Sequence, residues 1–145
     1  MDKNDILEIL EYQFGKDIKN EFEKHDFEIK KSKSRRIEII VNKKPILYLN
    51  PKFFLFNFGI EFGKLLKKYK KFYVKVSSEF LKDIRDKKNV IRKNVIEFSK
   101  DFRFGDDIII LDEKDNLIAI AKAKINSYEI SNSNYGIVAR IKKFI

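Results

Sequence analysis

Apolar residues at the start of the chain recur at the three- and four-residue steps of an α-helix. The side chains that follow this spacing are Ile6, Leu7, Leu10, Phe14, Ile18 and Phe22. The pattern predicts one amphipathic helix over residues 4–24, with Asn4 or Asp5 as its N-cap and Glu8 placed for a capping box. Gly15 lies in the middle of this helix and lowers its stability by about 1 kcal/mol relative to alanine.

The next apolar runs are shorter. Residues 36–41 and 45–49 flank an Asn-Lys-Lys turn and predict a hairpin. Asn50-Pro51 has the N-cap and first-turn proline of a short helix. Phenylalanine or isoleucine occupies every second position of residues 54–62, and this period of two predicts a strand. Residues 64–71 follow as a basic connection.

The second half of the chain predicts a run of strands with one short helix. Its clearest segment is 102–123, where two apolar, β-branched runs flank a polar turn at 112–116. A helix is expected at 77–87, and a strand at 90–98 is expected to be interrupted near Lys93-Asn94. The other strands are expected at residues 72–76, 108–111, 117–124 and 137–145, with turns over residues 127–135.

The chain is strongly basic. It has 145 residues, with 32 Lys and Arg against 22 Asp and Glu and a formal net charge of +10. A charge of this size selects polyanionic partners, either nucleic acid or an anionic membrane, and says nothing about the fold. A hydrophobic fraction of 43% is enough to form a core. We expect two small domains, residues 1–69 and 70–145.

Residue counts exclude several kinds of site. With no cysteine and one histidine, His25, the chain has no disulfide framework and no thiolate or multi-histidine metal site. Turn chemistry explains the acids at residues 106–107 and 112–115, which lack EF-hand spacing. No nucleophile elbow or phosphate loop occurs, so we expect no enzyme, no cofactor and no metal. Without a signal-peptide pattern or an apolar run of bilayer length, we expect a cytoplasmic protein.

Several segments of the second half carry a family resemblance. They are Phe104-Gly105-Asp106, the apolar pair of strands that follows it, Ala-Ile-Ala-Lys-Ala at 119–123 and Gly-Ile-Val-Ala-Arg at 136–140. Together they resemble a PUA domain, a small RNA-binding β-barrel named after pseudouridine synthases and archaeosine transglycosylases. Asn94 and Ala121 depart from the pattern, because glycine is frequent there. Asparagine tolerates left-handed backbone angles, so we expect the turn at Asn94 to survive.

Upstream segments resemble a more specific family. Gly-Ile-Glu-Phe-Gly-Lys at 59–64 precedes a basic stretch, a strand and a short helix, and Tyr-Leu-Asn-Pro-Lys stands at 48–52. This order is similar to the Nip-seven family of large-subunit ribosome biogenesis factors, although the chain is shorter than most members. The resemblance implies an α+β fold, with a small N-terminal α/β domain followed by a PUA-like β-barrel, and RNA binding without catalytic activity.

Basic residues in two segments form the predicted RNA site. Residues 64–93 hold 12 Lys or Arg against 3 Asp or Glu, and phosphate contacts need flexible cations held by rigid elements. Arg140 and Lys142 share one side of the last predicted strand. The full predicted set is Lys64, Lys67, Lys68, Lys70, Lys71, Arg85, Lys88, Arg92, Lys93, Arg140, Lys142 and Lys143. Phe72 and Tyr73 are the expected base-stacking residues, whereas the phenylalanines of 53–62 are expected in the core.

We therefore expect a noncatalytic RNA-binding factor in large ribosomal subunit assembly and pre-rRNA processing. The expected partners are rRNA precursors, through U-rich or unpaired segments, together with pre-ribosomal particles and assembly proteins. The chain is expected to be a monomer without membrane contact, because the helix at 4–24 is too acidic for an anionic bilayer. Two alternatives remain: a translation factor of the density-regulated PUA type, and an RNA-binding subunit of an RNA-modification enzyme.

Overall fold

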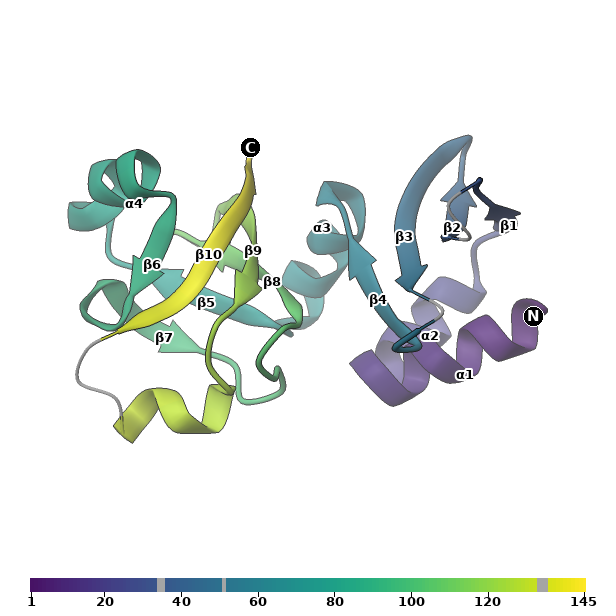
Figure 1. Ribbon diagram of the computed structural model, residues 1–145, viewed down its shortest axis with the longest axis horizontal. Helices are drawn as coiled ribbons and strands as arrows, with labels where there is room; N and C mark the ends of the chain where they lie inside the picture. The colour runs from purple at the N-terminus through teal and green to yellow at the C-terminus, as the bar shows by residue number, and fades with distance from the viewer. Residues whose placement is uncertain (34–35, 51, 133–135) are drawn as a thin grey trace. The chain divides into compact units, whose positions relative to one another are not determined.

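The structure is a computed structural model that describes residues 1–33, 36–50, 52–132 and 136–145. The chain divides into two compact units, Met1–Leu65 and Leu66–Ile145, each of which has its own sheet (Figure 1). Among the described residues, no helix has both the length and the apolar composition that spanning a bilayer requires.

The first unit begins with two helices, α1 (Lys3–Phe14) and α2 (Lys16–Glu23). The prediction of one continuous helix over 4–24 is wrong, because Gly15 has a φ of 100° and ends α1. The predicted capping residues are wrong as well. Asp2 is the N-cap and forms a reciprocal capping box with Asp5, which satisfies two backbone donors at the helix start.

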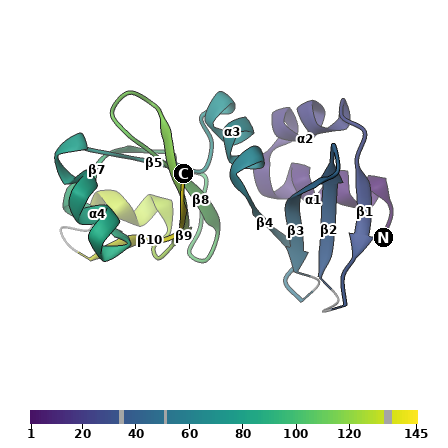
Figure 2. The same cartoon turned by 90° about the horizontal axis from the view of Figure 1, so that it is seen from above.

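The sheet of the first unit is antiparallel and has the order β1-β2-β3-β4, with α1 and α2 on one face (Figure 2). Its strands are β1 (Glu28–Lys31), β2 (Ile37–Val41), β3 (Lys44–Asn50) and β4 (Leu55–Phe58). The predicted hairpin is confirmed as β2 and β3, with Asn42 and Lys43 at positive φ in the turn, as primed hairpin turns require. The sequence analysis missed β1, an edge strand with no buried residue.

The segment after β3 differs from its prediction. Pro51 lies outside the described residues, and residues 52–54 form turns in place of the predicted helix. The predicted strand over 54–62 ends at Phe58, and helix α3 (Ile60–Tyr69) follows directly. Phe62 lies on this helix with 1% of its surface exposed and its ring 4.9 Å from that of Phe14. The alternation of apolar residues therefore extends by chance from β4 into α3, and Phe62 on α3 is still a core residue.

The second unit is built on a six-stranded sheet of order β6-β10-β9-β8-β5-β7, in which only β5 and β8 are parallel neighbours. Its strands are β5 (Tyr73–Val76), β6 (Asn89–Ile91), β7 (Val95–Phe98), β8 (Asp107–Leu111), β9 (Leu117–Ala123) and β10 (Ile137–Phe144). The short helices are η1 (Ser78–Phe80), α4 (Leu81–Lys87), η2 (Arg92–Asn94) and η3 (Ser127–Asn132).

Most of this second unit was predicted. The hairpin β8–β9 and the interruption of the strand at η2 are confirmed, and every residue of β8 is buried. Part of the predicted turn region, residues 133–135, lies outside the described residues. The chain has the predicted α+β fold, with helices and an antiparallel sheet followed by a PUA-like half-barrel.

One side chain covers the exposed backbone of β4, which is an edge strand of the first sheet. The N–H of Phe56 donates to Gln13 Oε1 at 2.6 Å, and Gln13 Nε2 donates to the carbonyl of Phe56 at 3.0 Å. The amide of Gln13 thus takes the place of a neighbouring strand. Because it comes from α1, it also fixes this helix against the sheet.

We predict that Gln13→Leu lowers the free energy of unfolding by about 2 kcal/mol, because two hydrogen bonds to a part-buried backbone are lost. Urea unfolding followed by circular dichroism measures this change. The matched control is Glu8→Gln, an exposed position of the same helix, which should change stability by less than about 0.5 kcal/mol. Equal effects of the two substitutions would contradict the role given to Gln13.

Candidate nucleic-acid interface

The positive charge is concentrated in the second unit. Residues 66–145 contain 19 Lys or Arg against 11 Asp or Glu, whereas residues 1–65 contain 13 against 11. A polyanion is therefore attracted mainly to the second unit. Within it, residues 82–93 of α4, β6 and η2 carry six cations and only two acids.

A tight turn joins α4 to β6 and fixes the cations at the end of the helix. Lys88 has a φ of 57° and a ψ of 30°, and its N–H donates to the Ile84 carbonyl at 2.8 Å. The carbonyl of Lys88 then accepts the N–H of Ile141 on β10 at 2.9 Å. This αL position is one where glycine is usual. The turn lets β6 start at once, so the end of α4 lies beside β10.

Pairing of β6 with β10 brings further cations to the same place. Arg140 lies opposite Asn89 in the register of the two strands, and its side chain is exposed. The Arg85 guanidinium of α4 lies 5.1 Å from the ring centre of Phe144 on β10. A cation held over an aromatic face loses part of its freedom while its donors stay available. We name the residues Arg85, Lys87, Lys88, Lys93 and Arg140 the α4–β10 surface.

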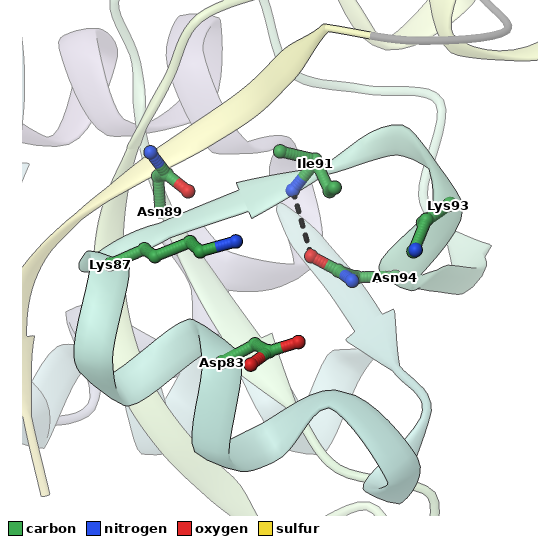
Figure 3. Close-up of a pocket in the computed structure, with 6 residues that line it drawn as sticks. All are labelled: Asp83, Lys87, Asn89, Ile91, Lys93 and Asn94. Atoms are coloured by element: carbon green, nitrogen blue, oxygen red, sulfur yellow. Dashed lines mark hydrogen bonds between the residues drawn. The ribbon is translucent and has the colours of Figure 1, made fainter.

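A small hollow of about 70 Å³ opens in this surface between α4, β6 and η2. Its lining residues are Asp83, Lys87, Asn89, Ile91, Lys93 and Asn94. Figure 3 shows Asp83 and Lys87 extending from α4 toward β6, with Lys93 on the η2 side. The ammonium group of Lys93 also lies 5.4 Å from the ring centre of Phe80.

Asn94 forms the floor of the hollow and is only 4% exposed. Its Oδ1 accepts the N–H of Ile91 at 2.9 Å (Figure 3), and its carbonyl accepts the N–H of Ser77 at 2.9 Å. Among the described residues, Asn94 is not one of those with positive φ. The turn survives as predicted, but the reason was wrong: the side chain of Asn94 closes the turn by a hydrogen bond.

The hollow combines groups that suit a nucleotide better than a bare anion. Lys87 and Lys93 supply ammonium groups for phosphate oxygens. Asp83 supplies acceptor oxygens, which repel a phosphate but accept hydrogen bonds from the amino group of a base. Phosphates can therefore bind at the rim while the edge of an unpaired base enters the hollow.

Two of the predicted RNA-binding residues form hydrogen bonds or ion pairs with other groups of the protein. Arg92 Nε donates to the Ile130 carbonyl at 2.8 Å, which ties η2 to η3. Lys142 Nζ lies 2.9 and 3.0 Å from the carboxylate oxygens of Asp107, which is 1% exposed. These contacts give both residues structural roles that charge counting did not reveal.

A β-bulge lies at Lys142. On β10, Ile141 faces Ala121 and Lys143 faces Ile120, so Lys142 is the extra residue. Arg140 faces Lys122, and Lys122 faces Asp107, so the contact of Lys142 with Asp107 agrees with the prediction that Arg140 and Lys142 share one side of the strand. Lys143 is exposed.

The predicted lysines around α3 form a separate group from the α4–β10 surface. Lys64 pairs with Glu61 at 3.3 Å on α3. Lys67 and Lys70 lower the pKa of Asp115 through their charge, after the larger effect of Lys75. Lys68 lies 5.5 Å from the ring centre of Tyr69, and Lys71 follows the helix, partly exposed. Acidic neighbours thus offset part of the charge of this group.

Tyr73, Lys75, Glu97 and Asp115 form a polar network on β5, β7 and the β8–β9 turn. Lys75 Nζ lies 2.7 Å from Asp115 Oδ1 and 3.3 Å from Glu97 Oε2. The hydrogen bond from Lys75 lowers the pKa of Asp115, and those from Tyr73 and Lys75 lower the pKa of Glu97. Burial raises the pKa of Tyr73, whose hydroxyl donates to Glu97 at 3.0 Å.

The predicted stacking residues are not available for RNA. Phe72 is 2% exposed and Tyr73 is 9% exposed. The N–H of Phe72 donates to the carboxylate of Asp101 at 3.0 Å, so this segment is fixed in the core. The prediction that these two rings stack on bases is therefore wrong.

The sequence analysis also missed members of the hollow. Asp83 and Asn89 were not predicted, and Lys87 was counted in the basic segment but left out of the predicted set, although all three lie within residues 64–93. The missing signal is the spacing of the helix: residues 83 and 87 are one turn apart, so they share a face. Asn89 has no sequence signal of this kind, because its position depends on β10.

Comparison with known proteins adds a family to this geometry. Residues 72–145 match the PUA domain, and residues 4–72 match the patch-forming domain C2 of tRNA-guanine transglycosylase. The chain belongs to the PUA domain family. The α4–β10 surface and its hollow lie entirely within the residues matched to the PUA domain, a match that supports RNA binding by this unit.

Sequence similarity to known proteins extends across both units of the chain. The tRNA-guanine(15) transglycosylase of Pyrococcus abyssi is 28% identical over 97% of the chain, and that of Methanococcus vannielii is 29% identical over 94%. The chain spans only 24% and 22% of the length of these two proteins. A hypothetical protein of Pyrococcus horikoshii has the same fold, with a TM-score of 0.73, 18% identity, and coverage of 99% of this chain and 92% of that one.

These comparisons overturn the predicted family and process. The expectation of the Nip-seven family is wrong, because the N-terminal unit matches the C2 domain of a transglycosylase. Large-subunit ribosome biogenesis is wrong for the same reason, since the relatives that cover nearly the whole chain are named as tRNA enzymes. The Gly-Ile-Glu-Phe-Gly-Lys segment spans the residue before α3 and the first five residues of this helix, and it was too short to separate PUA families.

We predict that Lys142→Met lowers the free energy of unfolding by about 2 kcal/mol, because a buried carboxylate loses its ammonium partner. This value is below the range for fully buried pairs, since the Lys142 side chain is 42% exposed. Urea unfolding at pH 7 measures the loss. Lys143→Met is the matched control and should be near neutral, and adding Asp107→Asn to Lys142→Met should restore part of the stability. A neutral Lys142→Met would contradict the assignment.

A pH dependence follows from the network around Lys75. The folded pKa values of Asp115 and Glu97 are lowered, so their stabilising effect is present above the unfolded values near about 4 and is lost as the pH falls through the folded ones. We predict that Lys75→Met is less stable than the unchanged protein at pH 7 and that this difference shrinks below about pH 4. Thermal unfolding across this range measures it, with exposed Lys100→Met as the control. A constant difference would refute the prediction.

Proposed function

We propose that this chain is a noncatalytic tRNA-binding module of a tRNA-modification system, with the α4–β10 surface as its main RNA contact. The observation that carries the proposal is similarity over both units to tRNA-guanine(15) transglycosylases. The geometry supplies a surface that fits this role. Any base-modifying step lies outside these 145 residues, on another polypeptide or segment.

The charge of the α4–β10 surface supports phosphate binding. Its cations come from a helix end, a short 3-10 turn and a paired strand, which hold them in fixed relative positions. Fixed cations contact phosphates in one register and lose less side-chain entropy than cations on a mobile loop. Because phosphates attract all RNA, these contacts give affinity and orientation without sequence specificity.

Selectivity for tRNA has a different physical source. A-form duplexes hide their base edges in a deep major groove, so proteins read unpaired nucleotides and overall shape. The hollow beside Asp83 and Asn94 has room for the edge of a base and no room for a duplex. A tRNA offers both a stem for the cations and unpaired bases for the hollow.

The absence of catalysis is part of the proposal. No group of three or more His, Cys, Asp or Glu side chains among the described residues is placed to hold a metal ion. The matched segment is under a quarter of the length of the two transglycosylases compared above. We infer an RNA-binding subunit or segment that presents tRNA to an enzyme, in agreement with the modification-enzyme alternative of the sequence analysis.

The test is binding of a tRNA transcript by the triple variant Arg85→Gln, Lys87→Gln, Arg140→Gln. Each lost phosphate contact lowers the slope of log affinity against log salt by roughly one, so we expect a decrease of about three and an affinity loss of roughly 100-fold near physiological salt. Filter binding at several salt concentrations measures both quantities. An rRNA fragment of equal length and a perfect RNA duplex serve as competitor probes.

The control removes the same charge elsewhere. Lys16→Gln, Lys100→Gln, Lys114→Gln takes three exposed lysines from outside the α4–β10 surface and should change the affinity less than about fivefold. Equal losses in the two triples would show a diffuse charge effect and reject the surface. Equal or tighter binding of the rRNA fragment would reject tRNA as the preferred RNA.

A further inference from the structure

The β3–β4 connection of the first unit exposes two neighbouring aromatic rings. Phe53 is 64% exposed and Phe54 is 55% exposed, and Leu55 beside them is 37% exposed. The expectation that all phenylalanines of 53–62 belong to the core is therefore wrong for these two. Phe56, Phe58 and Phe62 do lie in the core, with at most 4% exposure. Most of the surface of these two adjacent rings is therefore accessible to solvent.

The backbone holds these rings outward in a defined conformation. Asn50 Oδ1 accepts the N–H of Lys52 at 2.9 Å, and the Asn50 carbonyl accepts the N–H groups of Phe53 at 3.2 Å and Phe54 at 2.9 Å. Phe54 has a φ of 52°, which a bulky side chain rarely adopts. Such a conformation persists only where the surrounding structure imposes it, and it is enriched at binding sites.

Cations lie at the same end of the sheet. The register places Lys31 opposite Ile37 and Ile37 opposite Leu49, one residue before Asn50. Figure 2 shows that β1 and β3 end, and β2 and β4 begin, at this common end of the sheet. The exposed cations here are Lys31, Lys33, Arg36 and Lys52.

The cations are also close to aromatic rings. The Lys52 ammonium lies 5.6 Å from the ring centre of Phe53, and the Arg36 guanidinium lies 4.3 Å from that of Tyr48. Residues 29–55 contain eight Lys or Arg and one acid, Glu38. We name Phe53, Phe54, Lys31, Arg36 and Lys52 the sheet-end surface.

The chemistry of this surface selects its occupant. Exposed rings surrounded by cations form the arrangement that binds single-stranded nucleic acid, in which bases stack on rings and phosphates meet the cations. An apolar protein partner would have to bury these cations away from water, which is costly. A polyanion with flat apolar faces satisfies both parts of the surface.

We infer that the sheet-end surface is a second RNA contact, which stacks one or two unpaired bases on Phe53 and Phe54. The inference rests on the proposed function for the presence of RNA, and it adds a site on the first unit with its own ligand chemistry. Phe53 and Phe54 bind bases through their faces, and Lys31, Arg36 and Lys52 bind the adjoining phosphates. The contact therefore requires single-stranded nucleotides, whatever their sequence.

The experiment uses the full chain and a single-stranded RNA of about 12 nucleotides with 2-aminopurine at a central position. Stacking on a ring quenches this fluorescent base, so the unchanged protein should quench it on binding. The double variant Phe53→Leu, Phe54→Leu keeps apolar side chains and removes the rings. We expect it to lose the quenching and to bind the RNA roughly tenfold more weakly, with the same affinity for an RNA duplex.

Two controls separate the possible failures. Tyr12→Leu removes a ring on α1 that is even more exposed and should leave quenching and affinity unchanged. The Arg85, Lys87 and Arg140 triple should weaken duplex and tRNA binding but retain the quenching.

If the leucine variant quenches and binds like the unchanged protein, the sheet-end surface is not an RNA contact, even if tRNA binding holds. If the unchanged protein binds neither probe, the proposed function fails as well. Loss of a protein partner with RNA binding intact would assign the rings to a protein interface and overturn the inference.

Discussion

The pairing of β10 with β6 is the contact on which the candidate interface depends. It places Arg140 opposite Asn89, and the Ile141 N–H binds the carbonyl of Lys88 at the end of α4. Without this pairing, Arg85 would have no Phe144 beneath its guanidinium, and β6, which is only three residues long and lies at the edge of the sheet, would lose the strand that fixes it. The end of the chain thus completes a surface that begins far earlier in the sequence.

Local patterns predicted the elements of the fold better than their ends. The β8–β9 hairpin was clear because two β-branched runs flank an acidic turn, and Asp112 accepts hydrogen bonds from Lys114 and Asn116 there. The sequence indicated that Gly15 weakens the predicted helix. It did not show that the helix breaks there, because tertiary packing selects the φ of 100°. The alternation at residues 54–62 failed because Phe58 and Phe62 are four apart, a spacing that is even and is also one helical turn.

The candidate site was harder to predict than the fold, because charge alone does not show which side chains are free. Arg92 and Lys142 look like their neighbours in the sequence, but a carbonyl on η3 and a buried carboxylate on β8 engage them. Both partners lie far away along the chain. The exposure of aromatic side chains was mispredicted for the same reason. Phe72 and Tyr73 follow lysines in the sequence but are buried, whereas the exposed Phe53 and Phe54 were expected in the core.

Backbone strain offers a signal that is independent of charge. Lys88 and Phe54 both have positive φ, which costs an L-residue about 1–2 kcal/mol and which glycine would relieve. Strain alone does not mark a site, because Lys43 has the same feature in an ordinary hairpin turn. Lys88 and Phe54 differ from Lys43 in that each belongs to one of the two surfaces proposed above as RNA contacts. A glycine at either position would ease the turn and remove a side chain from a proposed RNA contact, so the two proposals account for residues that backbone conformation alone disfavours.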